Sequence, residues 1–134
     1  MRIIALQGPS NKGKTTTFNI LHQMILSHGG VSTNRHGYGG DPNDFIDTVL
    51  YNNLRIGILS MGDQSTPIAK EIWNFYNHNC DLVICALSTG TPKVRANNAL
   101  NHFNATRIQK TIAPNANAEL AVNTADAQTI FNLI

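Results

Sequence analysis

The sequence predicts an α/β protein of three layers, in which a mainly parallel five-stranded sheet lies between helices on both faces. Apolar runs of strand length alternate along the chain with longer segments whose apolar residues recur at helical spacing. Two consecutive strand-like runs are joined by only two residues, which predicts one antiparallel strand at an edge of the sheet. The length of 134 residues favours a single domain, residues 1–134, with one core.

The first strand-like run and the first helical run flank a glycine-rich loop. Residues 2–7 form an apolar run typical of a buried strand, and residues 16–28 carry an apolar stripe at helical spacing. Between them the chain reads Gly8-Pro9-Ser10-Asn11-Lys12-Gly13-Lys14-Thr15, the pattern G-x-x-x-x-G-K-T. Gly8 allows a sharp turn off the strand, and Gly13 lets the backbone approach a ligand closely. Unpaired N–H groups at the start of the helix favour an anion such as phosphate.

This strand–loop–helix segment resembles the Walker A motif of the P-loop NTPase superfamily. The resemblance implies a P-loop nucleotide-binding domain in which Lys14 reaches the β- and γ-phosphates and the Thr15 hydroxyl ligates Mg²⁺. The cofactors that it implies are Mg²⁺ and ATP. The expected nucleotide-binding residues of the loop are Gly8, Pro9, Ser10, Asn11, Lys12, Gly13, Lys14, Thr15 and Thr16.

Residues 30–44 form an irregular, glycine-rich segment that carries Arg35, His36 and Asp41. In P-loop folds the segment after the first helix often closes over the nucleotide or contacts a second substrate. The segment is therefore either a functional loop or a flexible surface connection.

Residues 45–51 and 54–60 are two β-rich runs separated by Asn52-Asn53, which predicts a hairpin. The hairpin resembles the kinase–GTPase division of P-loop proteins, in which the Walker B strand neighbours the P-loop strand. On this resemblance Asp63 joins the Mg²⁺ shell, although Ser60 occupies the strand-end position where many family members carry the acid. The alternative is that Asp63 is an ordinary turn or helix N-cap residue.

A helix is expected from Thr66, as N-cap, with Pro67 at its first position, to about Asn77. Glu71 is the single acid of this helix. It either orients an attacking water, as a third catalytic residue beside Lys14 and Asp63, or lies on a solvated helix face.

Residues 81–87 form an unbroken apolar run, which is typical of a central parallel strand. The loop that follows lies at the carboxyl end of that strand, where α/β folds bind ligands. Its candidate site residues are Ser88, Thr89, Lys93 and Arg95. Lys93 and Arg95 are expected to neutralise phosphate charge at the nucleotide, and the alternative is that these groups are helix caps and solvated cations.

The remaining third of the chain predicts a helix over 94–104, an edge strand over 105–113 and a final helical segment. Residues 123–126 (NTAD) are expected to break that last segment in two, with Thr124 capping the second piece.

The charge composition limits the kinds of binding partner that the sequence indicates. The net charge of +2 and the 13% of charged residues do not indicate nucleic acid or a membrane surface as a partner, and the neutral-polar surface permits self-association. Because Met1-Arg2 leads directly into the first strand and no apolar run has membrane length, we expect a cytoplasmic protein. Cys80 and Cys85 are expected to be reduced and too far apart to bridge.

Several family features are missing from the sequence. There is no guanine-reading N-K-x-D motif, which favours ATP without excluding GTP, and there is neither a kinase lid nor the helical domain of AAA+ machines. The lysine of the ParA-type loop is absent too, because Pro9 occupies its position.

Three functions are compatible with these residues. The first is a small Mg-dependent ATPase, in which Glu71, Asp63 or Gln64 orients the water and an arginine comes from Arg35, Arg95 or a neighbouring subunit. The second is a phosphotransferase, a kinase for a nucleotide or another small molecule, in which Asp41 or Asp44 accepts the proton of the acceptor hydroxyl. The third is a non-enzymatic, nucleotide-dependent switch that binds a protein partner.

Overall fold

The computed structural model describes the whole chain, residues 1–134, as one α/β unit with a mixed, mostly parallel sheet and four helices. The strands are β1 (Arg2–Gly8), β2 (Val31–Ser32), β3 (His36–Gly37), β4 (Phe45–Tyr51), β5 (Leu54–Leu59), β6 (Leu82–Ser88) and β7 (Thr106–Gln109). The helices are α1 (Lys14–Ser27), α2 (Ser65–Asn77), α3 (Val94–His102) and α4 (Glu119–Phe131), and a short 3₁₀ turn (Ala116–Ala118) precedes α4.

The sheet runs in the order β2-β4-β5-β6-β1-β7, with β3 also paired to β4. Strands β5, β6, β1 and β7 are parallel, and β4 is antiparallel to β5, as predicted. The expected count of five strands was too low and β4 is not the edge strand, because the irregular segment 30–44 contributes β2 and β3, both antiparallel to β4. Each is only two residues long, too short to produce a periodic pattern in the sequence.

One expectation about strand order is wrong. The strand that leads to Asp63, β5, does not neighbour the loop strand β1, because β6 lies between them. Both β5 and β6 are apolar runs. Such a run indicates that a strand is buried on both faces, but it does not indicate which strand it pairs with.

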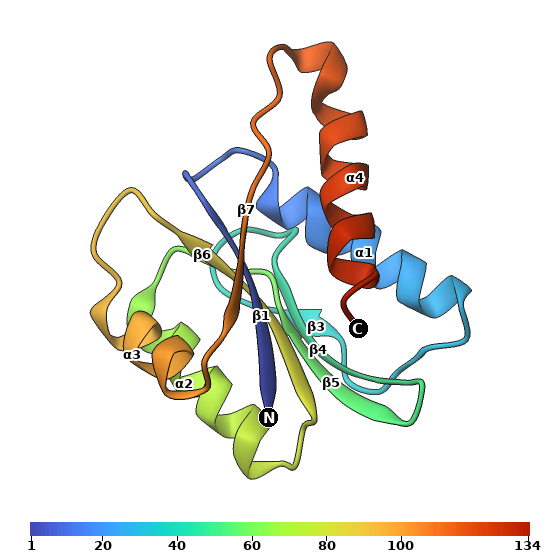
Figure 1. The fold of residues 1–134 in the computed structure, drawn as a ribbon, viewed down its shortest axis with the longest axis vertical. Helices are drawn as coiled ribbons and strands as arrows, with labels where there is room; N and C mark the ends of the chain where they lie inside the picture. Colours follow the sequence, from blue (N-terminus) through green and yellow to red (C-terminus); the bar gives the residue numbers. More distant parts are fainter.

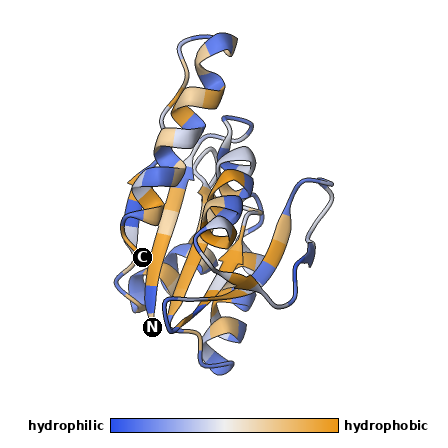
Figure 2. Ribbon diagram, turned by 90° about the vertical axis from the view of Figure 1, so that its right-hand side faces the viewer, coloured by the Kyte–Doolittle hydropathy of each residue, from blue (hydrophilic) through white to orange (hydrophobic).

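The helices cover both faces of the sheet, as predicted. Figure 1 shows α1 and α4 on one side of the sheet and α2 and α3 on the other. Apolar side chains fill the two interfaces, so that Phe18 and Leu21 of α1 pack with Leu6 in one core and Ile72 of α2 packs with Ala5 in the other. Figure 2 shows the apolar strands between helices of mixed hydropathy.

Element ends differ from the sequence-based expectations. Helix α1 starts at Lys14, so the last two loop residues are already helical. Helix α2 starts at Ser65 with Gln64 as N-cap, so Thr66 is not the cap; the Ser65 hydroxyl instead accepts a bond from the Ala96 N–H of α3. Helix α3 ends at His102, and β7 stops at Gln109.

Helix α4 is continuous through 123–126, which corrects the expected break. The residues that resemble a turn in the sequence face inward, because Asn123 and Asp126 are both buried. The Asp126 carboxylate accepts bonds from the N–H and the hydroxyl of Thr111 and pairs with Lys110 at 2.9 Å. Long-range polar contacts therefore overrode the local preference of Asn and Asp for turns.

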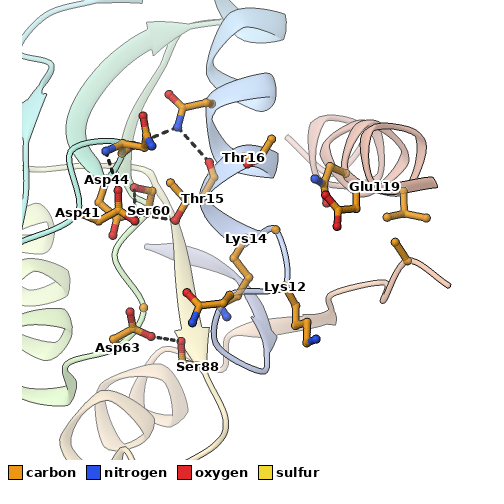
Figure 3. A pocket seen from close by; sticks show the side chains of 18 of the residues that line it. Lys12, Lys14, Thr15, Thr16, Asp41, Asp44, Ser60, Asp63, Ser88 and Glu119 are labelled. Atoms are coloured by element: carbon orange, nitrogen blue, oxygen red, sulfur yellow. Dashed lines mark hydrogen bonds between the residues drawn. The ribbon is translucent and has the colours of Figure 1, made fainter. Parts of the chain in front are cut away.

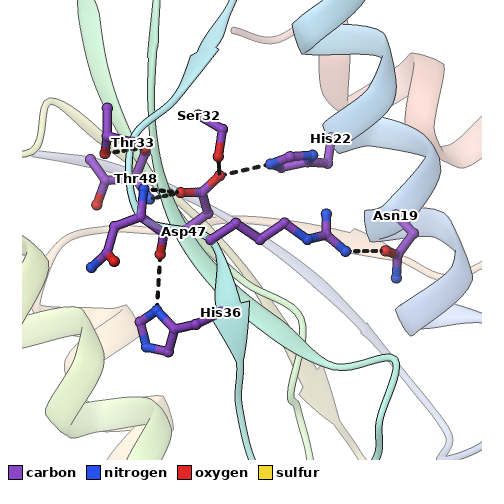
Figure 4. A network of polar contacts seen from close by, with 9 residues as sticks. Asn19, His22, Ser32, Thr33, His36, Asp47 and Thr48 are labelled. Carbon is purple, nitrogen blue, oxygen red and sulfur yellow. Dashed lines mark hydrogen bonds and ion pairs between the residues drawn. The ribbon is translucent and has the colours of Figure 1, made fainter.

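A buried polar network joins α1, β2 and β4 beneath the loop end of the sheet (Figure 4). Asp47 of β4 lies 2.7 Å from His22 Nε2, and it accepts bonds from the Ser32 hydroxyl and the N–H groups of Asn34 and Thr48. His22 is itself buried, with 2% of the residue exposed.

The cysteines and the lengths of the helices bear on two further expectations. Cys80 and Cys85 are buried and unbridged, as expected. No helix combines the length and the apolar character that a membrane crossing requires.

Candidate functional site

The glycine-rich loop lies between β1 and α1, at the carboxyl end of the parallel strands. Gly13 has φ of +97°, in the left-handed region that favours glycine. A Cβ added at this position would also overlap the side chain of Asn123, which packs against the loop from α4. Gly13 is therefore required both by its backbone conformation and by the close approach of α4.

Lys14 folds back into the loop instead of pointing to solvent. Its Nζ donates to the carbonyl oxygens of Gly8 at 3.0 Å and Pro9 at 2.6 Å, and only 6% of the residue is exposed. No carboxylate oxygen lies within ion-pair distance of this ammonium. Burial lowers the pKa of Lys14 against the opposing effect of Asp63. A buried cation without a counter-ion favours an anionic ligand at this point.

The Thr15 hydroxyl donates to a carboxylate that sequence reasoning did not pair with it. Its partner is Asp44 Oδ1, at 2.8 Å, and the Ser60 hydroxyl donates to the same oxygen at 2.9 Å. Asp44 precedes β4, and since β4 is antiparallel to β5, its first residue lies beside the carboxyl end of β5. Asp44, which directly precedes β4, therefore lies beside Ser60 at the end of β5. The Walker B pattern instead predicts an acid at the end of β5 itself.

Asp63 lies on the other side of the loop mouth. Its Oδ1 accepts bonds from the hydroxyls of Ser88, at 2.5 Å, and Ser10, at 3.1 Å. The hydrogen bond from Ser88 is the main cause of the lowered pKa of Asp63, with Ser10 and Lys14 adding to it against the effect of burial. Asp63 is therefore an ionised carboxylate in the site, but it does not contact Thr15.

These residues line a cavity of about 630 Å³ (Figure 3). The loop contributes Asn11, Lys12, Gly13, Lys14, Thr15 and Thr16, and the acidic side contributes Asp41, Asn43, Asp44, Ser60, Asp63 and Ser88. Among the remaining loop residues, Gly8 and Pro9 hold Lys14 by their carbonyls and Ser10 holds Asp63. The structure thus brings every predicted loop residue to one site.

A search against family models, curated proteins and solved structures found no match for this chain.

The other predicted site residues lie elsewhere. Glu71 does not line the cavity: it accepts a bond from the Tyr38 hydroxyl at 2.8 Å and another from Asn74. Burial and this bond raise the pKa of Tyr38 to about 12. The role of Glu71 in orienting water is not supported, because its helix lies on the face of the sheet opposite α1.

The two cations after β6 also lie outside the cavity at the loop. Lys93 is buried and donates to the carbonyl and the hydroxyl of Thr91, and it lines a separate hollow of about 430 Å³ with Arg107. Arg95 is exposed and lines neither space. Helical phase explains the difference, because Lys93 and Arg95 project from different sides of the start of α3.

Arg35 does not line the cavity either, although its partner Asn19 does. Its guanidinium lies 3.8 Å from the centroid of the Phe45 ring and donates to Asn19. Only the end of the segment 30–44, from Asp41 to Asp44, reaches the cavity.

Sequence reasoning missed one whole wall of the cavity. The connection after β7 and the start of α4 contribute Ile112, Ala113, Glu119, Val122 and Asn123. None of these residues belongs to a recognisable motif, and more than 90 residues separate them from the loop that they face.

Proposed function

We propose that this chain is a P-loop protein that binds a nucleoside triphosphate and hydrolyses ATP with Mg²⁺. The observation that carries the proposal is Lys14, a buried ammonium held only by backbone carbonyls within a loop at the start of a helix. When the nucleotide binds, phosphate oxygens replace the two carbonyl oxygens as the hydrogen-bond acceptors of Lys14. The loop N–H groups and the dipole of α1 add to the attraction for negative charge.

The donors beside the loop fit Mg²⁺. Thr15 offers a hydroxyl and Asp44 a carboxylate, which are the hard oxygen ligands that Mg²⁺ prefers. The chain has no cluster of three or more acidic, histidine or cysteine side chains that would hold a metal unaided, so phosphate oxygens and water would have to supply the rest of the shell. When bound, the ion neutralises charge on the phosphates.

Asp63 is the group that we assign to the attacking water. It is ionised, lines the cavity and sits between Ser10 and Ser88, on the opposite side of Lys14 from α4 (Figure 3). Its carboxylate accepts a hydrogen bond from the water, whose oxygen attacks the γ-phosphorus while the bond to the β–γ bridging oxygen breaks and ADP leaves with that electron pair. The proton lost by the water passes through the Asp63 carboxylate to solvent. Lys14 holds the phosphate oxygens in place during this step.

The first test replaces Lys14 with alanine. Titration calorimetry with Mg·ATP is expected to show about tenfold weaker binding or worse, since a charge-assisted hydrogen bond contributes about 1.5–3 kcal/mol. Phosphate release is expected to fall to background in the same variant. Lys70→Ala is the matched control, because Lys70 is an exposed lysine of α2 remote from the cavity.

The outcomes separate the candidate functions. Unchanged binding and hydrolysis in Lys14→Ala would overturn the proposal. Tight ATP binding without turnover in the unaltered protein would instead indicate the nucleotide-dependent switch.

A second function, phosphotransfer, is favoured by the hollow beside the end of β6. Lys93 and Arg107 line it, and neither has a carboxylate within ion-pair distance. Arg107 is held by the amide oxygens of Gln7, Asn97 and Asn101. Two cations without counter-ions suit an anionic acceptor next to the γ-phosphate. ADP formation that starts only when an anionic acceptor with a free hydroxyl is added would identify this function over hydrolysis.

A further inference from the structure

The cavity at the loop has two ends of different chemistry. Figure 3 shows Asp44 and Asp63 on one side of Lys14 and Glu119 of α4 on the other. The first end is built from carboxylates and hydroxyls. The second is the wall that follows β7, and it carries the cavity's aliphatic side chains, Ile112, Ala113 and Val122.

The two ends suit the two halves of a nucleotide. The triphosphate and its Mg²⁺ carry the charge and need Lys14, Thr15 and the carboxylates. The nucleoside is uncharged, and its base has apolar faces with a polar edge. Ligand pockets hold such groups with apolar side chains and a few placed polar atoms. With the phosphates at the loop and the metal at Asp44, the nucleoside extends toward the second end.

Asn123 supplies the placed polar group. Only 6% of the residue is exposed, and it packs against Gly13 of the loop. Its side-chain amide makes no hydrogen bond within the protein and remains accessible at the cavity wall. A ligand that offers both a donor and an acceptor can therefore pair with this amide without breaking a contact within the protein.

This wall is held rigidly against the loop. Lys110 and Asp126 form a buried ion pair at 2.9 Å, and Asp126 also accepts from the N–H of Thr111 at 2.8 Å and its hydroxyl at 2.7 Å. The Lys110 N–H donates to Gln7 of β1, next to the loop. These contacts tie the chain after β7 to α4 and to the loop strand, so that the wall is formed before a ligand arrives.

We propose that Ile112, Val122 and Asn123 form the nucleoside subsite of this cavity. The base lies against Ile112 and Val122, and the Asn123 amide hydrogen-bonds to the polar edge of the nucleoside. The inference rests on the proposed nucleotide binding and adds to it the residues that distinguish a nucleotide from a bare polyphosphate.

The test compares two ligands on the same protein. Titration calorimetry measures the affinity for Mg·ATP and for Mg·tripolyphosphate, which has the phosphates but no nucleoside. Asn123→Ala and Ile112→Ala are each expected to weaken Mg·ATP about tenfold, or about 1.4 kcal/mol, and to leave Mg·tripolyphosphate within about twofold. Ile112 is about half exposed, so its truncation decides the question even if Asn123→Ala does not fold.

Leu120→Ala is the matched control. Leu120 is an aliphatic residue at the same end of α4, but it is 69% exposed and does not line the cavity. Both affinities are expected to stay unchanged in this variant.

Three results would count against the inference. The assigned subsite is wrong if Ile112→Ala and Asn123→Ala leave the affinity for Mg·ATP unchanged. It is also wrong if they lower the affinities for Mg·ATP and Mg·tripolyphosphate equally. Neither result contradicts the phosphate site. If the unaltered protein binds neither ligand, the proposed function itself fails and the subsite falls with it.

Discussion

Asp44 and Asp63 are the two carboxylates nearest the loop, and their partners give them different roles. Asp44 accepts from Thr15 and Ser60 and is almost fully buried, whereas Asp63 accepts from Ser10 and Ser88 at the cavity surface. The carboxylate that touches the Thr15 hydroxyl is the one suited to the Mg²⁺ shell. Sequence reasoning assigned that place to Asp63.

The two assignments separate in a magnesium titration. Asp44→Asn is expected to raise the Mg²⁺ concentration for half-maximal ATP turnover about tenfold or more, because a charged oxygen ligand is lost. Asp63→Asn is expected to reduce the maximal rate while it leaves the Mg²⁺ requirement within about twofold. Phosphate release measured across Mg²⁺ concentrations gives both values. If Asp63→Asn raises the Mg²⁺ requirement and Asp44→Asn does not, Asp63 is the metal ligand instead.

Gly13 provides a second prediction for a single residue. Gly13→Ala is expected to abolish detectable ATP binding, because its φ of +97° and the contact with Asn123 both exclude a Cβ. Gly40→Ala is the matched control, since a Cβ there meets nothing and its φ is not positive. Circular dichroism checks that each variant is folded before calorimetry. Normal ATP affinity in Gly13→Ala would show that ATP binding does not depend on the left-handed backbone at this position.

Among the elements, β4 connects the site to the rest of the sheet. Asp44, the residue before β4, accepts a hydrogen bond from Thr15. Asp47, within β4, contacts His22 of α1 and Ser32 of β2. Burial raises the pKa of Asp47, but hydrogen bonds from Ser32, His22 and the Asn34 N–H outweigh it and hold that pKa below its ordinary value. The ionised carboxylate therefore fastens α1, which carries the loop, to the antiparallel part of the sheet.

This network makes stability depend on pH. Since the folded-state pKa of Asp47 is depressed, its contribution is complete above the unfolded value of about 3.9 and is lost as pH falls through the folded value. Asp47→Asn is expected to lower the free energy of unfolding by about 2 kcal/mol or more at pH 7 and to flatten the acid-side decline. Urea titrations between pH 3 and about pH 7 measure both effects. Glu119→Gln, at an exposed carboxylate that makes no side-chain hydrogen bond, is the control, and an equal loss there would contradict the prediction.

At the scale of the whole molecule, ligand binding and folding are linked. The cavity is lined by residues from the loop after β1 to the start of α4, so the proposed nucleotide would contact segments from both ends of the chain. A ligand that binds only the folded state stabilises it by about 2.7 kcal/mol at a concentration of 100 Kd.

Scanning calorimetry tests this linkage. Mg·ATP at 100 Kd is expected to raise Tm by roughly 10 °C for a domain of this size. Lys14→Ala is expected to show little of that shift at the same ATP concentration. An equal shift in both proteins would mean that ATP binds somewhere other than the loop.

The hairpin pattern in the sequence also determines part of the site. The two-residue turn at Asn52-Asn53 sets the hairpin register, in which Ile46 pairs with Leu59. Continuing that register by one residue places Phe45 opposite Ser60, and Asp44 beside the strand end. The hairpin pattern therefore already contains the position of Asp44, whereas the Walker B pattern points only to Asp63.

The sequence by itself determined the α/β class, the strand, loop and helix of residues 2–27, and the antiparallel hairpin. Each of these follows from contacts between residues close in the chain, namely periodicity, glycine placement and a two-residue turn. Only the tertiary structure decided that β6 lies between β1 and β5, that Asp44 meets Thr15, and that α4 supplies the second wall of the cavity. Those contacts join segments far apart in the chain, and they depend on how whole elements pack, which no local pattern records.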